Sequence, residues 1–236
     1  MNLQTFNFIQ WRKNRLKKYE DMCNEGVAKN DILQVRENNN RKEVDFYLIN
    51  VIEDIADYLD FLREVDSCRD GDLITVHINC YGGNCDVAMN IYDCLKLTPA
   101  DVEVSIEGAC CSCASMIMLA GNCWKVFPHS YVMIHAWTEG IYGKWHEIIS
   151  KFNFEKSVFE KQFKELYKNF LTDTEIEDCV KGKDFYFDST ETVKRLNIYQ
   201  KEDVECDEAI KKITDKYSSL AEKEVNQYLK KVSKKR

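Results

Sequence analysis

Ser112 is the residue of this chain best placed for nucleophilic chemistry. It lies in the stretch from Gly108 to Gly121, which reads GACCSCASMIMLAG and contains no charged residue. The small residues allow the start of a helix to approach neighbouring backbone closely, and the apolar run that follows indicates a helix buried on every side. A hydroxyl at such a start lies near unpaired N–H groups and the positive end of the helix dipole, which suits a reaction that builds an oxyanion. A capping serine at a small-residue packing site gives the same pattern and is the commoner case.

A glycine pair and a histidine accompany this serine. Gly82 and Gly83 follow a short, β-branched run directly, in the sequence NCYGG at residues 79–83. Glycine at position 83 suits the close approach of a peptide backbone. His135 ends another short strand, in the sequence MIH, 23 residues after Ser112. A serine hydroxyl becomes a good nucleophile when a histidine takes its proton, and backbone amides can then hold the tetrahedral oxyanion.

Each of these residues has a competing interpretation. His135 could be a core histidine at a strand end. Ser115 lies three residues after Ser112 and competes as the nucleophile, although its helical neighbours are bulkier. Lys125 would offer a Ser–Lys dyad, but it lies inside a predicted strand. His129 stands in a Pro-His-Ser turn, and we expect it to be exposed.

The surrounding sequence predicts alternating strands and helices. Short runs of β-branched residues predict strands, and apolar residues at helical spacing predict the helices between them. The expected strands are 44–51, 73–79, 102–106, 125–127 and 131–135, with helices at 52–65 and 87–97 and a buried helix that opens at Gly108. A polar loop is expected from Arg36 to Arg41. This order of elements favours an α/β layered fold.

A long helix is predicted to begin at Lys144. Its apolar stripe at helical spacing consists of Trp145, Ile148, Phe152, Phe159, Phe163, Leu166 and Phe170. The stripe is wide enough for contact with a partner, and packing within its own domain explains it equally well. A short acidic helix is expected at 172–180, another helix from Ser189 to near Asn197, and a Lys-rich surface helix at 207–236.

Composition narrows the class of protein. The chain has 236 residues, 44% of them hydrophobic, and a net charge of −7, which argues against nucleic acid as the main partner. No apolar run approaches the length of a membrane span, and the N-terminus lacks the order of a signal peptide. The cysteines number eleven, and several stand in small or apolar runs as small buried hydrophobes. We therefore expect no zinc site, no cofactor and a reducing, cytoplasmic location.

Together and in this order, the glycine pair, the Ser112 stretch and the strand that ends at His135 resemble the Clp-type serine peptidases, the proteolytic subunits of the ATP-dependent Clp protease. The resemblance covers about residues 44–205. It is nearest to phage relatives, whose small-small-Ser-small-small-Ser pattern is matched by CCSCAS at 110–115. The resemblance implies Ser112 as the nucleophile, His135 as the general base and Asp184 as the acid. Asp173 and Asp188 are competing acids in the same region.

The resemblance also implies the groups that hold the substrate. The N–H groups of Gly83 and Cys113 would be the oxyanion donors, and the segment Gly82-Gly83 would bind an extended peptide as an added β-strand. The sequence departs from the family at Cys80-Tyr81, where the family usually has Ser-Pro, and this change is expected to loosen the oxyanion loop.

The family fold is a crotonase-like spiral of βαβ units with a protruding long helix, the handle, which residues 144–171 would form. In the family, the handle joins subunits across two stacked rings, so the resemblance implies a homo-oligomer. An AAA+ unfoldase is the partner it implies, although no axial pore loop is recognisable in this sequence.

These patterns predict an α/β serine endopeptidase that cleaves unfolded or extended polypeptides. The expected parts are an N-terminal extension at 1–40, a Clp-type peptidase domain at 41–205 and a C-terminal helix and basic tail at 206–236. Its role would be protein turnover or phage capsid maturation, in a bacterial cytoplasm or a phage-infected cell, with neither nucleic acid nor a membrane as partner. The alternatives are a crotonase-type acyl-CoA enzyme and an inactive structural paralogue on the same fold.

Overall fold

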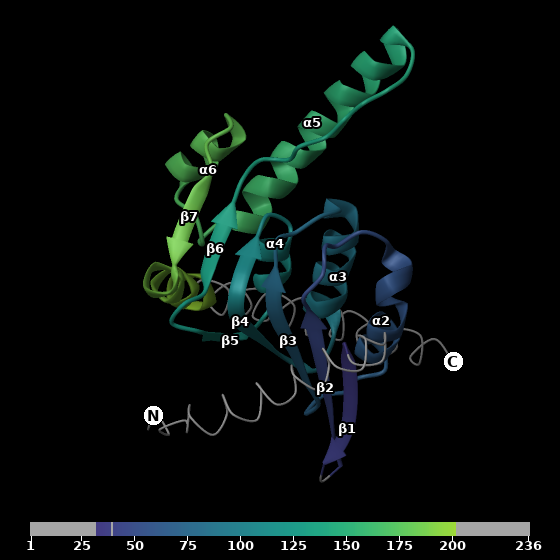
Figure 1. Cartoon of the computed structure of the whole chain (residues 1–236), viewed down its shortest axis with the longest axis vertical. Helices are drawn as coiled ribbons and strands as arrows, with labels where there is room; N and C mark the ends of the chain where they lie inside the picture. Colours follow the sequence, from purple (N-terminus) through teal and green to yellow (C-terminus); the bar gives the residue numbers. More distant parts are fainter. Residues whose placement is uncertain (1–31, 39, 202–236) are drawn as a thin grey trace, which may run out of the picture. The chain divides into compact units, whose positions relative to one another are not determined.

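The computed structural model describes residues 32–38 and 40–201, which fall into two compact units (Figure 1). The first unit ends at Ile134 and the second begins at His135. Most of the predicted N-terminal extension and the whole predicted C-terminal helix at 206–236 lie outside the described residues, so the domain boundaries at 40 and 205 stay predictions. Within the described part, no helix is long and apolar enough to span a membrane.

The first unit is built on a sheet with a parallel centre. Its strands are β1 (Leu33–Asn38), β2 (Arg41–Leu48), β3 (Leu73–Cys80), β4 (Asp101–Cys111), β5 (Cys123–Val126) and β6 (Tyr131–Ile134). β2, β3 and β4 lie side by side and parallel, β1 pairs antiparallel with β2, and β5 and β6 each pair in parallel with β4. Because helices connect β2 to β3 and β3 to β4, the chain makes two successive βαβ units, and the predicted mixed α/β fold is confirmed.

The helices of the first unit cover the apolar face of this sheet. They are η2 (Ile55–Tyr58), α2 (Leu59–Asp66), α3 (Cys85–Leu97) and α4 (Ala114–Met118). Phe46 of β2 stacks on Phe61 of α2 with the ring centroids 4.0 Å apart, and the even-numbered residues from Ile74 to Cys80 of β3 and from Val102 to Ile106 of β4 are almost fully buried. On the opposite face, His77 lies between Glu107 at 2.7 Å and Asp45 at 3.1 Å. This alternation follows from the two-residue period of a strand.

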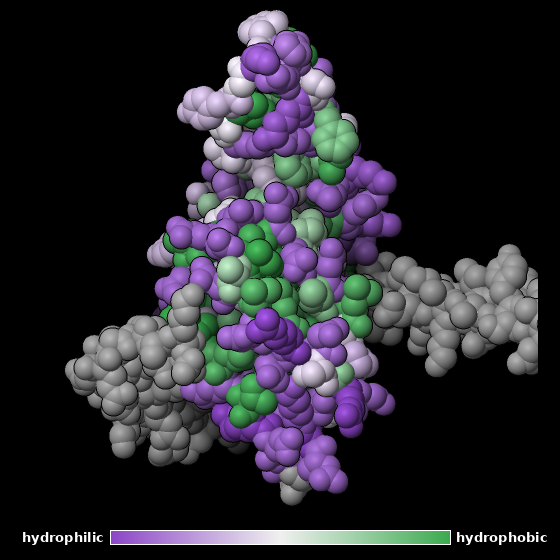
Figure 2. Space-filling model, turned by 90° about the vertical axis from the view of Figure 1, so that its right-hand side faces the viewer, coloured by the Kyte–Doolittle hydropathy of each residue, from purple (hydrophilic) through white to green (hydrophobic). Residues whose placement is uncertain are grey.

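The helix-bearing side of the first unit is not uniformly polar. Figure 2 shows apolar side chains gathered between polar ones on the face that carries α2 and α3. Among the described residues of this unit, the most exposed large apolar side chains are Leu97, Tyr81 and Val51.

The polar segment from Arg36 to Arg41 was predicted as a loop, and that prediction is wrong. β1 extends to Asn38 and β2 begins at Arg41, and Asn40 between them has a φ of 64°, which asparagine tolerates in tight hairpins. The segment is polar because β1 is an edge strand stabilised by cross-strand charges, as in the ion pairs of Arg36 with Glu43 and Asp45.

The second unit contains α5 (Trp145–Tyr167), α6 (Asp173–Val180), β7 (Phe185–Asp188) and a helix over 189–201. The long helix and the short acidic helix are therefore confirmed close to their predicted bounds. The last helix was predicted to end near Asn197, but it continues through 201. Its N-terminus is fixed by Asp188, whose side chain accepts a hydrogen bond from the Glu191 amide at 2.8 Å.

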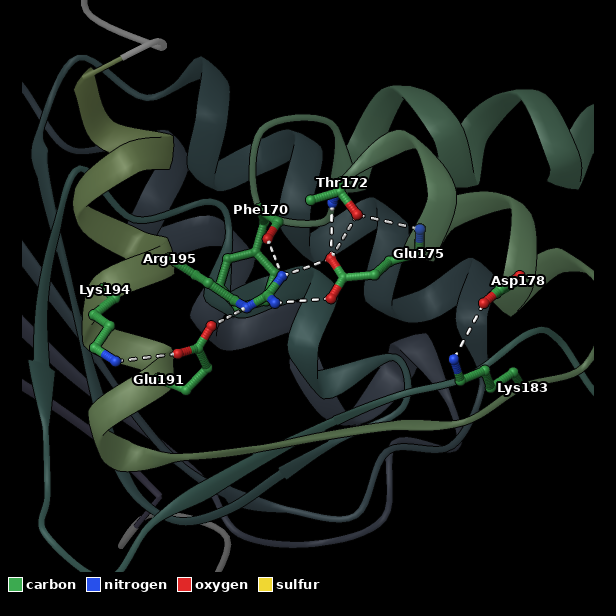
Figure 3. Close-up of polar contacts among 8 residues, drawn as sticks. All are labelled: Phe170, Thr172, Glu175, Asp178, Lys183, Glu191, Lys194 and Arg195. Carbon is green, nitrogen blue, oxygen red and sulfur yellow. Dashed lines mark hydrogen bonds and ion pairs between the residues drawn. The ribbon is translucent and has the colours of Figure 1, made fainter.

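Arg195 connects elements of the second unit through hydrogen bonds (Figure 3). Its guanidinium donates two hydrogen bonds of 2.8 Å to the carboxylate of Glu175, one of 2.9 Å to Glu191 and one of 3.0 Å to the carbonyl of Phe170. Glu175 also completes a capping box with Thr172 at the start of α6. The bidentate pair with Arg195 is the main reason that the pKa of Glu175 falls to about 2.

Candidate active site

Ser112 occupies a sharp turn between β4 and α4. Its φ is 54°, in the left-handed region that only three non-glycine residues adopt in the part of the chain that the structure describes. Such a conformation is costly for a residue with a Cβ, and it is typical of sites where the fold must present one side chain. The Ser112 amide donates a hydrogen bond of 2.8 Å to the carbonyl of Met133, which anchors the turn to β6.

The expected buried helix opening at Gly108 is wrong in its position. β4 continues through Gly108 to Cys111, and α4 contains only Ala114–Met118. A helix of five residues has a small dipole, so stabilisation of an anion at Ser112 would depend on individual amides rather than on a macrodipole. The strand is longer than predicted because its small residues fit the closely packed layer between β3 and β6, where Cys110 and Cys111 are buried.

The first glycine of the pair lies directly against this turn, and the second lies against the backbone of Ile52. Gly82 has a φ of 98°, and a Cβ added there would lie 2.7 Å from the Cβ of Ser112 and 3.2 Å from the Cys113 nitrogen. Gly83 has a φ of 149°, and a side chain there would collide with the backbone of Ile52. The segment is held by hydrogen bonds from Ile52 N to Gly82 O at 3.0 Å and from Asn84 N to Ile52 O at 2.6 Å. At both positions, neighbouring atoms lie too close to leave room for a side chain, so glycine is required.

Cys80 lies in the proposed oxyanion loop, which the departure from the family sequence at Cys80-Tyr81 was predicted to loosen. The side chain of Cys80 holds this loop by two hydrogen bonds. Its thiol donates to the carbonyl of Asn50 at 3.0 Å and accepts a hydrogen bond from the Gly82 amide at 3.3 Å. The sequence pattern gave no role to the side chain of Asn79. In the structure its Oδ1 accepts a hydrogen bond of 3.0 Å from the Ala109 amide, and a Cβ added at Gly108 would collide with that oxygen. Gly108 therefore provides space for a contact between β3 and β4, and the only sequence signal for it was the glycine itself.

Three further residues, Ser115, Lys125 and His129, were alternative candidates for the catalytic roles, and their surroundings differ from those of Ser112. Ser115 is fully buried, and its hydroxyl donates a hydrogen bond of 2.6 Å to the carbonyl of Ser112. Lys125 forms an exposed ion pair of 2.6 Å with Glu103. His129 is exposed, as predicted. The geometry of the first unit therefore favours Ser112 over Ser115 as an accessible nucleophile, and it places Lys125 in a surface pair.

His135 and Asp184 belong to the second unit, whereas Ser112, Gly82 and Gly83 belong to the first. His135 is half-buried and follows β6 directly, and Asp184 is exposed and precedes β7 directly. Burial and the nearby Asp184 carboxylate raise the pKa of the Cys179 thiol to about 11, which places Asp184 beside α6. Asp188 is engaged as the cap of the helix at 189–201. The triad of Ser112, His135 and Asp184 stays a prediction.

A pocket begins one residue after His135 in the second unit. It has a volume of about 320 Å³ and lies between the segment 136–141, α5 and Val180. Trp137 stacks on Phe159 with centroids 4.5 Å apart and meets Phe163 edge to face. Among the residues that the structure describes, the indole Nε1 of Trp137 and the Oε2 of Glu155 have no hydrogen-bond partner although both atoms are buried, so the pocket wall offers one donor and one acceptor. Phe159 and Phe163 were predicted to lie on the apolar stripe of α5, but no pattern in the sequence predicted that Trp137 packs against them.

The cysteines and acidic residues do not form a metal centre in the described part of the chain. The nine cysteines there are outside disulfides, and no cluster of three His, Cys, Asp or Glu side chains within 32–38 and 40–201 could hold a metal ion. Cys110 is buried among apolar groups, and burial raises the pKa of its thiol well above the ordinary value.

Residues 42–195 match the family model for Clp protease. The chain belongs to the Clp protease family. An ATP-dependent Clp protease proteolytic subunit from Porphyromonas gingivalis is 35% identical to it over 104 residues, which cover 43% of this chain and 44% of the relative. The subunit of the same name from Bacteroides fragilis is 33% identical over 108 residues, with 45% and 49% covered. That from Ligilactobacillus salivarius is 37% identical over 90 residues, with 37% and 44% covered.

These matches cover less than half of the length of each relative. The family match agrees with the resemblance of the glycine pair, the Ser112 stretch and the His135 strand end. The matched range of the family model also includes Asp184 and the whole of α5.

Proposed function

We propose that this Clp-family chain is a serine endopeptidase in which Ser112 is the nucleophile, His135 the general base and Asp184 the acid. The observation that carries the proposal is the packing of Gly82 against the left-handed turn at Ser112, with Gly83 held against the backbone of Ile52. That arrangement puts a serine next to backbone amides in a segment that tolerates no added side chains. Family membership supports the assignment of the histidine and the acid.

The proposed reaction is acyl transfer through a covalent intermediate. His135 takes the proton of the Ser112 hydroxyl as its oxygen attacks the scissile carbonyl, and Asp184 orients the imidazole and stabilises the imidazolium. The amides of Gly83 and Cys113 hold the oxyanion, and each donor of this kind contributes about 3 kcal/mol in comparable sites. His135 then protonates the leaving amine, and water repeats the sequence to release the acid.

The proposed substrate is an unfolded or extended polypeptide. It would pair with the Gly82-Gly83 segment as an added strand, which gives affinity through main-chain hydrogen bonds with little dependence on sequence. The aromatic pocket next to His135 in the chain would take an apolar side chain of that peptide, and Trp137 Nε1 and Glu155 Oε2 would meet polar groups of its backbone.

The proposed assembly is a homo-oligomer of stacked rings joined through α5, with an AAA+ unfoldase as partner. The exposed apolar side chains on the first half of α5, among them Trp145, Phe152 and Phe154, support a contact of this helix with another chain. Protein turnover and phage capsid maturation are the two proposed settings. A bacterial cytoplasm or a phage-infected cell is the proposed location.

Labelling with a fluorophosphonate tests the nucleophile. The full chain should be modified once, at Ser112, and Ser112→Ala should abolish the reaction. Ser115→Ala is the matched control, since it removes a hydroxyl three residues away, and it should keep the labelling. Modification that persists in Ser112→Ala, located by peptide mapping to another serine, would overturn the assignment. Cleavage of an unfolded protein such as casein, lost in Ser112→Ala, separates an endopeptidase from an inactive paralogue.

A further inference from the structure

The pocket of the second unit carries more carboxylates than ammonium groups. Among the described residues, its lining includes three acidic side chains and one basic side chain, which are Glu139, Glu155, Glu160 and Lys156. Lys151, one turn before Glu155 on α5, is shared between two of these carboxylates, with its Nζ 2.8 Å from Glu139 Oε1 and 3.2 Å from Glu155 Oε1. Lys156 lies 3.9 Å from Glu160. In the described part of the chain, two lysines therefore accompany three carboxylates, so a ligand that enters this pocket meets a net negative charge.

One carboxylate oxygen of this pocket lacks a hydrogen-bond donor. Lys151 binds the carboxylate of Glu155 through Oε1, whereas Oε2 is buried and has no partner among the described residues. The indole Nε1 of Trp137 is likewise a buried donor that no acceptor of the described residues meets. Buried polar groups of native proteins are nearly always hydrogen-bonded. Each of these two atoms therefore favours a ligand that supplies the group it lacks.

A ligand that suits this pocket has a donor, an acceptor and an apolar body. An ammonium group is the best donor for Glu155 Oε2, because a hydrogen bond between two charged groups is roughly twice as strong as a neutral one. Trp137 Nε1 needs an acceptor, such as a carbonyl oxygen. The stacked rings of Trp137 and Phe159, together with Phe152, give the rest of the ligand an apolar wall.

The N-terminal residue of a peptide combines these three features. Its α-carbon carries an ammonium group, a carbonyl and a side chain, which can be apolar. A lysine side chain also ends in an ammonium group, but it has no acceptor for Trp137 Nε1. An internal residue has the carbonyl, but its N–H is neutral and does not complement the net negative charge. The pocket volume of about 320 Å³ is at the lower end of the range for small-ligand sites, which suits a single residue.

We propose that this pocket binds an apolar N-terminal residue, with the free α-ammonium group on Glu155 Oε2 and the carbonyl of the same residue on Trp137 Nε1. The binding itself does not depend on the proposed peptidase function. A consequence for catalysis does rest on that function, in which the same pocket takes a side chain of the substrate. The ligand then competes with the substrate, and peptides released with an apolar N-terminal residue inhibit the enzyme that produced them.

The test compares two probes by isothermal titration calorimetry on the full chain. Phenylalaninamide has the ammonium group, the carbonyl and an apolar side chain, and 3-phenylpropanamide differs from it only in lacking the ammonium group. Phenylalaninamide should bind at one site per chain, about tenfold more tightly than 3-phenylpropanamide. Glu155→Gln removes the charge and keeps the shape of the side chain, so it should abolish this preference. Trp137→Phe removes the N–H and keeps an aromatic ring, so it should weaken both probes alike, because both have the carbonyl.

Glu165→Gln is the matched control. Glu165 also lies on α5 and pairs with a lysine four residues earlier, Lys161 at 3.9 Å, but it is not part of the pocket lining. This variant should keep the preference for phenylalaninamide. Equal affinity of the unaltered chain for the two probes, or binding of neither, overturns the proposal. A preference that persists in Glu155→Gln places the binding outside this pocket and overturns it as well.

The proposed peptidase function is judged by a separate readout. If the chain shows the preference for phenylalaninamide but Ser112 does not react with the fluorophosphonate, the peptidase function fails and the binding site stands. If phenylalaninamide binds as expected but does not slow the cleavage of a peptide by an active chain, competition with the substrate is overturned.

Discussion

A side chain at Gly82 would occupy the space that the Cβ of Ser112 already fills, since the two carbons would lie 2.7 Å apart. We therefore expect Gly82→Ala to push the Ser112 turn out of place. A displacement of about 1 Å at a reacting group lowers rates by about 100-fold, so fluorophosphonate labelling and peptide cleavage should both fall by roughly that factor. Circular dichroism should still report a folded chain.

Gly71→Ala is the control for this variant. Gly71 has a φ of 88°, so alanine there meets a similar backbone penalty of about 1 kcal/mol, but no atom of the described residues lies within 4 Å of the added carbon. This variant should lose some stability and keep its labelling rate. Equal losses of labelling in the two variants would mean that backbone strain, and not the contact with Ser112, causes the effect.

Replacing Asp184 and Asp188 in turn by asparagine, which has the same shape as aspartate, shows which of the two residues is the catalytic acid. Asp184→Asn should lower kcat by about 10⁴-fold, because an asparagine holds a catalytic histidine in the wrong tautomer. Asp188→Asn should be nearly silent, because Asp188 caps a helix through its Oδ1 and asparagine caps as well as aspartate. Steady-state cleavage of a fluorogenic peptide measures both. A strong effect of Asp188→Asn with none of Asp184→Asn would move the acid to position 188.

The exposed half of α5 carries the prediction about assembly. Phe152 is 53% exposed, and we expect Phe152→Glu to dissociate the proposed oligomer by placing a charge in its proposed apolar contact. Asn153→Glu adds the same charge to an exposed polar neighbour and should leave the sedimentation coefficient unchanged. Phe163 is unsuited to this test, since it is 3% exposed and packs inside its own unit. An unaltered particle in Phe152→Glu would exclude this part of α5 from the interface.

The sequence predicted those parts of the fold in which one local pattern decides the structure. The β-branched run at 73–79 and the apolar spacing at 87–97 predicted β3 and α3 to within two residues. For the stripe on α5 the sequence left open packing within the unit and contact with a partner. In the structure Phe163 and Leu166 are buried, whereas Trp145 and Phe152 are exposed. Burial depends on what the rest of the chain brings to the helix, which periodicity does not report.

The errors occur where a tertiary contact overrides the local pattern. Residues 109–111 are small and helix-compatible, but pairing with β3 and β6 keeps them in a strand. The polar residues of β1 resemble a loop until their cross-strand partners on β2 are known. At the candidate site, the motif predicted Ser112 and the glycine pair, whereas the close approach of Gly82 to the Ser112 turn depends on the fold, because 30 residues separate the two along the chain.

The ion pair of Arg195 with Glu175 predicts how stability changes in acid. The folded-state pKa of Glu175 is about 2, below its ordinary value of 4.5, so this carboxylate stabilises the fold above pH 4.5 and loses that contribution as the pH falls toward 2. Glu175→Gln keeps the capping box with Thr172 but removes the charge. We expect it to cost about 2 kcal/mol at pH 7 and much less at pH 3, measured by urea unfolding.

Glu177→Gln separates this effect from a general loss of acidic charge. Glu177 lies on the same helix, and its side chain pairs with the exposed Lys181 at 3.7 Å, a contact of the kind that contributes little. Its free energy of unfolding should stay within about 0.5 kcal/mol of the unaltered chain at both pH values. If Glu175→Gln lost as much stability at pH 3 as at pH 7, the hydrogen-bond geometry at Arg195, and not the charge of Glu175, would be what holds α6 to the helix at 189–201.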